Sequence, residues 1–127
     1  MPMDHPRLAS ILLVGSDISL ASSRANLLIQ AGHTVDLEVN VERALGRNCT
    51  TPYDLVVVCN KFSRAEQADI RARLKQTRPE QQVLLLGHCE DDPATFLESV
   101  STCFRLAAKR SGLGHAVAAW RGRARPI

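Results

Sequence analysis

One stretch limits the possible folds more than any other: Tyr53-Asp54-Leu55-Val56-Val57-Val58-Cys59-Asn60. Four consecutive apolar residues, three of them β-branched, follow a Pro-Tyr-Asp turn. A run that is apolar on both faces predicts a strand buried on both sides, as parallel strands are when helices cover the sheet. Ligands bind such sheets just beyond the carboxyl ends of the strands. Cys59 and Asn60 therefore stand where an active group is expected.

The rest of the chain alternates between strand and helix patterns. Apolar runs predict strands at 11–14 and 83–86, and the alternation of Val35, Leu37 and Val39 with polar residues predicts a strand near a sheet edge. Apolar residues at helical spacing, capping residues and turn residues predict helices at about 17–31, 41–47, 63–77 and 93–110. Gly32 is expected to end the first helix. Alternating strands and helices indicate a single α/β domain with a parallel sheet and right-handed crossovers.

Size and composition narrow the class of protein. A chain of 127 residues with 45% hydrophobic and 23% charged residues is typical of one globular domain. No apolar run approaches the roughly 20 residues needed to span a bilayer, and residues 1–10 lack the apolar core of a secretory signal. We therefore expect a cytoplasmic protein without a membrane association.

The four cysteines, Cys49, Cys59, Cys89 and Cys103, show no C-x-x-C spacing. In a cytoplasmic chain this favours buried or free thiols over a disulfide framework. Cys59 and Cys89 end strands that would be neighbours, about 5 Å apart, so a redox pair or a metal site that includes His88 is the alternative hypothesis. We expect buried thiols, with no metal and no cofactor, because closed zinc sites usually show paired ligand spacing.

The chain resembles the receiver domain of bacterial two-component response regulators. Four fragments carry the resemblance in family order and at family spacing over roughly residues 10–88: Ile11-Leu12-Leu13-Val14, Ala31-Gly32-His33-Thr34-Val35, Glu42-Arg43-Ala44-Leu45 and Pro52-Tyr53-Asp54-Leu55-Val56-Val57-Val58. The resemblance implies the flavodoxin-like (CheY-like) fold, a parallel sheet in the order 2-1-3-4-5 with helices on both faces.

The positions that carry the chemistry of receivers differ in this sequence. The resemblance places the phosphorylated aspartate at Cys59, and a thiol offers neither an acyl phosphate nor the hard oxygen ligand that Mg²⁺ prefers. The acidic pair falls on Gly15 and Ser16, with Asp17 one position further on and more suited to capping a helix. The switch Ser/Thr falls on Gly87, and the family lysine has no match. The pattern indicates a degenerate receiver that is not an enzyme.

The end of the sequence departs from the family as well. The helix that starts near Pro93 follows the fourth strand so closely that we expect the fourth helix and fifth strand to be deleted. The alternative places a poor fifth strand at 114–120. A deletion would leave the strand at 82–87 as an exposed edge without charges or prolines, and such edges pair with other chains. The apolar stripe on the last helix includes three candidate interaction residues, Phe96, Val100 and Phe104. We therefore expect a homodimer.

Two functions are compatible with these features. The first is a receiver-like domain, residues 1–112, that acts by protein–protein interaction without phosphorylation. The second is a nucleic-acid-associated regulator that uses a basic tail, residues 113–127, because Arg105 to Ile127 holds six basic residues and no acidic one. A short basic terminus is usually solvated, so nucleic acid is the less favoured partner.

Overall fold

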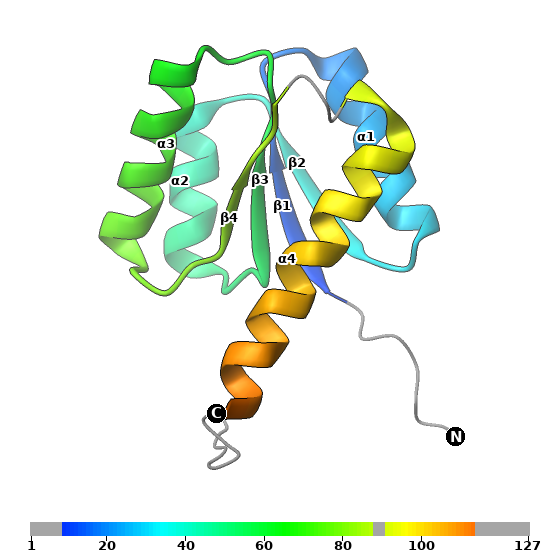
Figure 1. Cartoon of the computed structure of the whole chain (residues 1–127). Helices are drawn as coiled ribbons and strands as arrows, with labels where there is room; N and C mark the ends of the chain where they lie inside the picture. Colours follow the sequence, from blue (N-terminus) through cyan, green and yellow to red (C-terminus); the bar gives the residue numbers. More distant parts are fainter. Residues whose placement is uncertain (1–8, 88–90, 114–127) are drawn as a thin grey trace. The chain divides into compact units, whose positions relative to one another are not determined.

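The computed structural model describes residues 9–87 and 91–113, in which strands and helices alternate (Figure 1). The elements are β1 Ser10–Val14, α1 Ile18–Gln30, β2 Thr34–Glu38, α2 Val41–Thr50, β3 Leu55–Val58, α3 Arg64–Thr77, β4 Val83–Leu85 and α4 Pro93–Leu113. Every strand and helix expected from the sequence is present. Two helices are longer than predicted, because α2 continues past Arg47 to Thr50 and α4 continues past Ser111 and Gly112 to Leu113.

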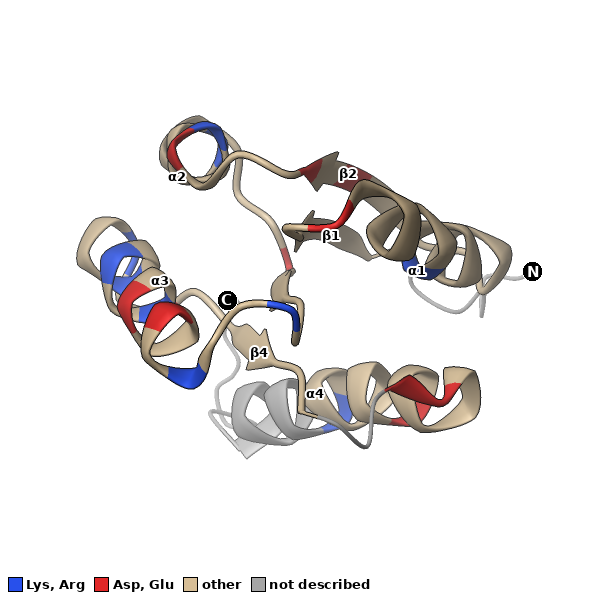
Figure 2. Cartoon of the chain, turned by 90° about the horizontal axis from the view of Figure 1, so that it is seen from above, with Lys and Arg blue, Asp and Glu red and all other residues tan. Residues whose placement is uncertain are grey.

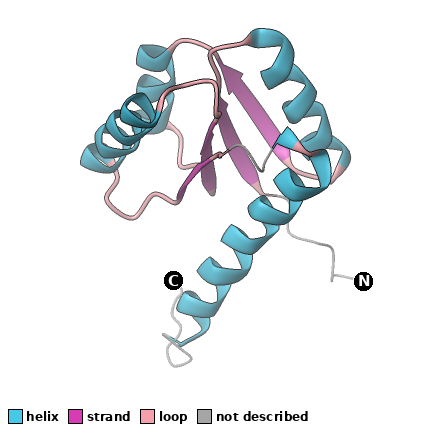
Figure 3. Ribbon diagram, turned by 45° about the horizontal axis from the view of Figure 1, so that its top comes forward, coloured by secondary structure: helices cyan, strands magenta, loops and turns pink. Residues whose placement is uncertain are grey.

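The described strands form one parallel sheet in the order β2-β1-β3-β4 (Figure 3). In the register, Leu13 of β1 stands between Leu37 of β2 and Val57 of β3. The order agrees with the flavodoxin-like prediction for the first four strands. β2 lies at one edge, as its alternating pattern predicted, and β4 is the other edge within the described ranges. A fifth strand at 114–120 lies outside the described residues, so the truncation stays a prediction.

Two helices, α2 and α3, cover one face of the sheet (Figure 2). Their apolar residues pack on the side chains that β1 and β3 point toward them, and the cluster of buried residues consists of Leu12, Val14, Ala44, Tyr53, Val56, Val58, Ile70 and Leu74. All four residues of β3 are completely buried. This burial on both faces confirms that residues 55–58 form an internal strand of a parallel sheet.

The helix α1 lies on the opposite face of the sheet, against β1 and β2. Its N-terminus is capped by Asp17, and the chain leaves its C-terminus through Gly32, whose φ of 101° is in the left-handed region that glycine adopts without strain. The buried residues of α1 are Ala21, Arg24, Ala25 and Leu28. These positions follow the i, i+3, i+4, i+7 spacing of a buried helical face, and one of them is an arginine.

Capping residues begin the remaining helices as the sequence suggested. Ser63 and Glu66 form a reciprocal capping box at the start of α3, and Asn40 caps α2 by accepting a hydrogen bond from the amide of Arg43. By its contacts the chain divides into two units, Met1–Phe96 and Leu97–Ile127, so the second part of α4 is described by itself. In that part Arg105 and Glu98 form an ion pair at 3.1 Å.

Candidate functional site

The carboxyl ends of β1 and β3 bring Gly15 and Cys59 together at one end of the sheet. The Gly15 amide donates to the Glu38 carbonyl at 3.0 Å, and the Cys59 amide donates to the Val14 carbonyl at 2.9 Å. Both residues are buried. Of the residues matched to receiver chemistry, these two are neighbours, while Ser16, Asp17 and Gly87 are exposed.

The packing around Gly15 is too close for a side chain unless a neighbour shifts. A Cβ atom at this position would lie 2.8 Å from the Cβ of Ala21 and 3.6 Å from the sulfur of Cys59. Asp17, the nearest carboxylate in sequence, accepts hydrogen bonds from the amides of Ser19 at 3.0 Å and Leu20 at 3.3 Å. Asp17 is therefore the helix cap that the sequence favoured over a metal ligand.

The thiol of Cys59 is only 2% exposed, and burial raises its pKa above the ordinary value, although a hydrogen bond with Arg24 acts in the opposite direction. Nucleophilic attack and redox exchange require the thiolate. A protonated, buried thiol is poorly suited to either. Cys89, the other member of the redox hypothesis, lies outside the described residues together with His88, so that hypothesis is untested.

The most unusual residue at this end of the sheet is Arg24, whose side chain is only 4% exposed. Its Nη1 donates to Oδ1 of Asn60 and its Nη2 to Oδ1 of Asp91, both at 3.1 Å. The guanidinium carbon also lies 5.8 Å from the centre of the Phe96 ring, within the range of a cation–π interaction. We call Arg24, Asn60 and Asp91 the Arg24 cluster.

Asn60 connects this cluster to the end of β4. Its Nδ2 donates to the Gly87 carbonyl at 2.9 Å and to Oδ1 of Asp91 at 2.8 Å. Gly87, which the resemblance matched to a hydroxyl side chain, therefore contributes a backbone oxygen here. Gln67 of α3 reinforces the same end of the sheet, because its buried Nε2 donates to the carbonyls of Cys59 at 3.1 Å and Leu86 at 2.9 Å.

Sequence analysis identified Cys59 and Asn60 as residues at the strand end but missed Arg24, Gln67 and Asp91. A signal for Arg24 was present, because an arginine one turn after Ala21 and one turn before Leu28 interrupts the apolar face of a helix. An arginine at such a position is rarely buried without a partner. The identity of the partners could not be deduced, because they lie 36 and 67 residues away in the chain.

The donor set does not fit a Mg²⁺ ion. Divalent hard cations require several oxygen ligands, usually carboxylates. Here the strand ends present a protonated thiol, a glycine and a guanidinium that already engages the one carboxylate of the cluster, Asp91. Residues 9–87 and 91–113 contain no group of three or more His, Cys, Asp or Glu side chains that could hold a metal ion.

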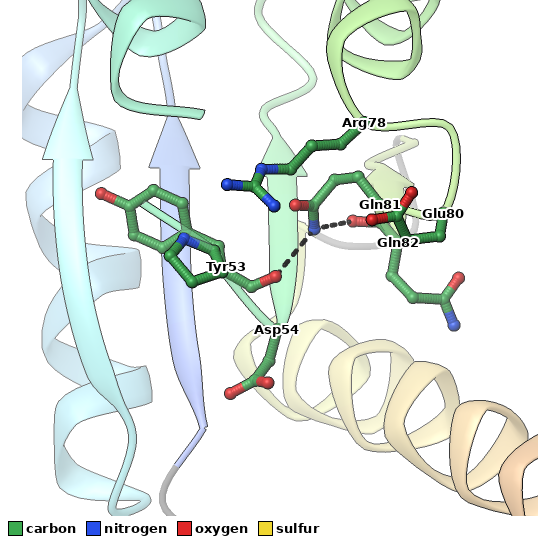
Figure 4. Close-up of a pocket in the computed structure, with 7 residues that line it drawn as sticks. Tyr53, Asp54, Arg78, Glu80, Gln81 and Gln82 are labelled. Carbon is green, nitrogen blue, oxygen red and sulfur yellow. Dashed lines mark hydrogen bonds between the residues drawn. The ribbon is translucent and has the colours of Figure 1, made fainter. Parts of the chain in front are cut away.

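A concave region lies at the opposite end of the sheet, where β3 and β4 begin (Figure 4). This open hollow of about 250 Å³ is lined by Pro52, Tyr53, Asp54, Arg78, Glu80, Gln81 and Gln82. Its polar groups stabilise the backbone: Gln81 donates to the Tyr53 carbonyl at 3.1 Å, Arg78 to the Asn48 carbonyl at 2.8 Å, and Asp54 accepts from the Ser10 amide at 2.8 Å. These contacts give the polar residues that line the hollow a structural role.

The three candidate interaction residues of α4 differ in exposure. Phe96 and Val100 are each 1% exposed, and Phe104 is half-buried. Their role in binding a partner stays a prediction.

None of the helices in the described ranges combines the length and the apolar character that crossing a bilayer requires.

Comparison with solved structures identifies the fold. A response regulator receiver domain protein (CheY-like) from Methanospirillum hungatei JF-1 is similar with a TM-score of 0.70 at 15% sequence identity, over 82% of this chain and 99% of that chain. The signal receiver domain of an HD domain-containing protein from Pseudomonas fluorescens Pf-5 gives a TM-score of 0.68 at 18% identity, over 81% and 99% of the two chains. No protein-family model and no curated protein matches the sequence.

This chain has the receiver fold. The similarity confirms the fold predicted from the four sequence fragments, and at these identities it establishes the fold alone. The residues at the carboxyl end of the sheet therefore have to carry the functional argument.

Proposed function

We propose that this chain is a signalling module with the receiver fold that acts by binding another protein molecule and does not take up a phosphoryl group. It has no catalytic role of its own in this proposal, and it works in the cytoplasm. A protein partner is favoured over nucleic acid. Three of the six basic residues that motivate a nucleic-acid hypothesis, Arg121, Arg123 and Arg125, lie outside the described residues.

The observation that supports this proposal is the Arg24 cluster. In receivers the corresponding end of the sheet holds carboxylates around a divalent cation, according to the resemblance described above. Here a buried guanidinium already engages the one carboxylate of the cluster, Asp91. A side chain at Gly15 would require a shift at Ala21, so a further carboxylate is not easily placed there. A Mg²⁺ ion would meet a like charge without the several oxygen ligands needed to offset the repulsion.

Incubation with acetyl phosphate and Mg²⁺ tests the proposal. The intact mass of the protein should stay unchanged, while a receiver that has the aspartate should gain one phosphoryl group under the same conditions. Asp54 provides an internal control, since it is an exposed carboxylate at the opposite end of the sheet. A stable adduct mapped to the carboxyl end of β1 or β3 would refute the proposal.

We further propose that the partner includes a second copy of this chain, bound through β4. The Val56 amide donates to the Gln82 carbonyl, and the Leu86 amide donates to the Val58 carbonyl. In a parallel ladder the residues between these, Val83 and Leu85, direct their N–H and C=O groups away from β3. No charged residue or proline occurs in 82–87 to protect this edge. A two-fold contact would pair the two edges and extend the sheet.

Light scattering at micromolar concentration distinguishes a dimer from a monomer. Val83→Pro removes an outward N–H, which an edge strand tolerates, and should weaken dimerisation by roughly tenfold or more because one ladder hydrogen bond is lost at each edge. Val83→Ala is the matched control, because it truncates the same side chain and keeps the N–H. A monomer mass for the unmodified chain, or equal weakening by both variants, would contradict pairing through β4.

A further inference from the structure

One oxygen atom in the Arg24 cluster receives two hydrogen bonds from different elements. Oδ1 of Asp91 accepts from Nη2 of Arg24 at 3.1 Å and from Nδ2 of Asn60 at 2.8 Å. A cationic and a neutral donor converge on a single anionic oxygen. This is the arrangement by which proteins bind the oxygens of phosphate and carboxylate groups.

The two sides of this ion pair differ strongly in exposure. The side chain of Arg24 is 4% exposed, whereas that of Asp91 is 64% exposed. A buried guanidinium needs an anionic or strongly polar partner, because its desolvation is costly. The carboxylate, in contrast, is open to solvent, the side from which another anion would approach.

Other contacts fix the guanidinium independently of Asp91. Its Nη1 donates to Oδ1 of Asn60, and its plane lies near the Phe96 ring at 5.8 Å. Asn60 is itself held through the Gly87 carbonyl at 2.9 Å. The two donors should therefore keep their positions when the carboxylate moves away, so the site is preorganised.

We propose that the Arg24 cluster is an oxyanion-binding site for phosphate or a phosphate monoester, and that the carboxylate of Asp91 is its tethered competitor. The cluster thus reverses the electrostatics of the receiver site, because the protein supplies the cation and the ligand supplies the negative charge. A guanidinium binds phosphate oxygens with two parallel hydrogen bonds more readily than any other side chain.

Asp91 and Arg24 belong to the same chain, and this covalent connection determines how strongly a free anion binds. A group of the same chain competes at an effective concentration on the order of millimolar. Phosphate must exceed this level to displace Asp91 in the unmodified chain. Removal of the carboxylate should therefore lower the Kd for phosphate by about tenfold or more.

Asp91→Ala tests the proposal, and Asp69→Ala is its control. Asp69 is a similarly exposed aspartate, 68% exposed, and its carboxylate lies 3.9 Å from a guanidinium, that of Arg73. Each variant is titrated with sodium phosphate at constant ionic strength, and binding is followed by NMR signals of the Arg24 and Asn60 side chains. We expect saturable binding to Asp91→Ala at least about tenfold tighter than to the unmodified chain, and no change for Asp69→Ala.

The outcomes separate the proposal from nonspecific binding. Equal affinities of the two variants, or signal shifts confined to other residues, would overturn it. Adding Asn60→Ala to Asp91→Ala should weaken phosphate binding by roughly tenfold, because a hydrogen bond to a charged group is lost. If that double variant does not fold, the shift of the Arg24 side-chain signals in Asp91→Ala decides alone.

A titration with methyl phosphate shows which phosphate species the site accepts. Binding equal to that of inorganic phosphate indicates a monoester ligand, and binding of inorganic phosphate alone indicates the free ion. Neither result depends on whether the chain dimerises.

Discussion

The strand β3 and the two residues that follow it are adjacent in sequence but are stabilised in different ways. Leu55 to Val58 are completely buried, apolar and paired with strands on both sides. Cys59 and Asn60 continue the same segment, yet their surroundings include a buried guanidinium, a buried glutamine amide and the backbone of β4. The strand depends on the hydrophobic effect, and the residues after it depend on hydrogen bonds.

This difference separates what makes the receiver fold from what makes a receiver site. Apolar burial is nondirectional, so many sequences can satisfy it at β3. The cluster beyond β3 requires particular donors and acceptors at distances near 3 Å, so a single substitution changes its chemistry. A chain can therefore keep the fold while the end of the sheet acquires another set of contacts.

The largest expected effect is a loss of folding stability when the apolar strand β3 is changed. Val57→Asp places an unpaired charge at a completely buried position, and its cost should exceed much of a typical folding free energy of about 5–15 kcal/mol. Circular dichroism should show an unfolded chain. Ala68→Asp, at an exposed position of α3, is the control and should melt near the native temperature. A folded Val57→Asp protein would mean that β3 is not the centre of the core.

Arg24→Ala should destabilise the protein by about 2–3 kcal/mol, because it leaves Asn60 without a buried donor and removes packing near Phe96. Urea unfolding measures this change. Arg24→Met should cost less, since it keeps an apolar stem of similar length. Arg73→Ala removes an arginine whose side chain is 38% exposed, and it should change stability very little. Equal effects of Arg24→Ala and Arg73→Ala would show that the Arg24 cluster contributes nothing to the fold.

Gln67→Ala should cost about 1–2 kcal/mol. The buried amide of Gln67 donates to carbonyls of Cys59 and Leu86, and its loss leaves these acceptors with fewer partners. Hydrogen exchange should become faster at the ends of β3 and β4 while the amides of β1 keep their protection. Gln76→Ala, at an exposed position of the same helix, is the control. A uniform loss of protection would indicate that the two regions unfold together.

The smallest expected effect is a decrease in the free energy of unfolding at alkaline pH. The pKa of Cys59 is raised, mainly by burial, above its ordinary value of 9.0. The folded state holds this proton more tightly than the unfolded chain does, so the associated stability is complete below pH 9 and is lost as the pH rises through the folded pKa. Urea unfolding at about pH 8 and pH 10 should show a decline that Cys59→Ala reduces.

Tyr53 has to be controlled in that experiment, because its pKa is also raised above its ordinary value of 10.0, chiefly by burial. Both measurements are therefore made in a Tyr53→Phe background. An identical pH dependence with and without Cys59 would mean that the pKa of the thiol is the same in the folded and unfolded states.

The sequence predicted the elements of the fold because their causes are local. The apolar run at 55–58, the capping box at Ser63 and Glu66, and Gly32 after α1 each act within a few residues. The end of α2 was predicted too early because its cause is not local. Asn48 donates to the Leu74 carbonyl at 3.3 Å and its own carbonyl accepts from Arg78, so contacts with α3 and the loop after it extend the helix.

The candidate site was predicted only in part. The cap role of Asp17 followed from its position before a helix, whereas the loss of receiver chemistry at Gly15 and Cys59 stays a prediction from the residue types. The Arg24 cluster joins residues from α1, the end of β3 and the start of α4, which no local pattern connects. The alternative that pairs Cys59 with Cys89 and the role of the tail stay untested, because Cys89 and residues 114–127 lie outside the described ranges.

The close contact at Gly15 has a consequence for the engineering of this chain. A substitution that introduces a side chain at position 15 brings its Cβ to 2.8 Å from the Cβ of Ala21, so α1 or the end of β1 has to shift. Ala21→Gly would remove this contact but weaken α1 by about 1 kcal/mol. The order of mutations therefore matters: an attempt to build a carboxylate at position 15 should begin with position 21 in the helix.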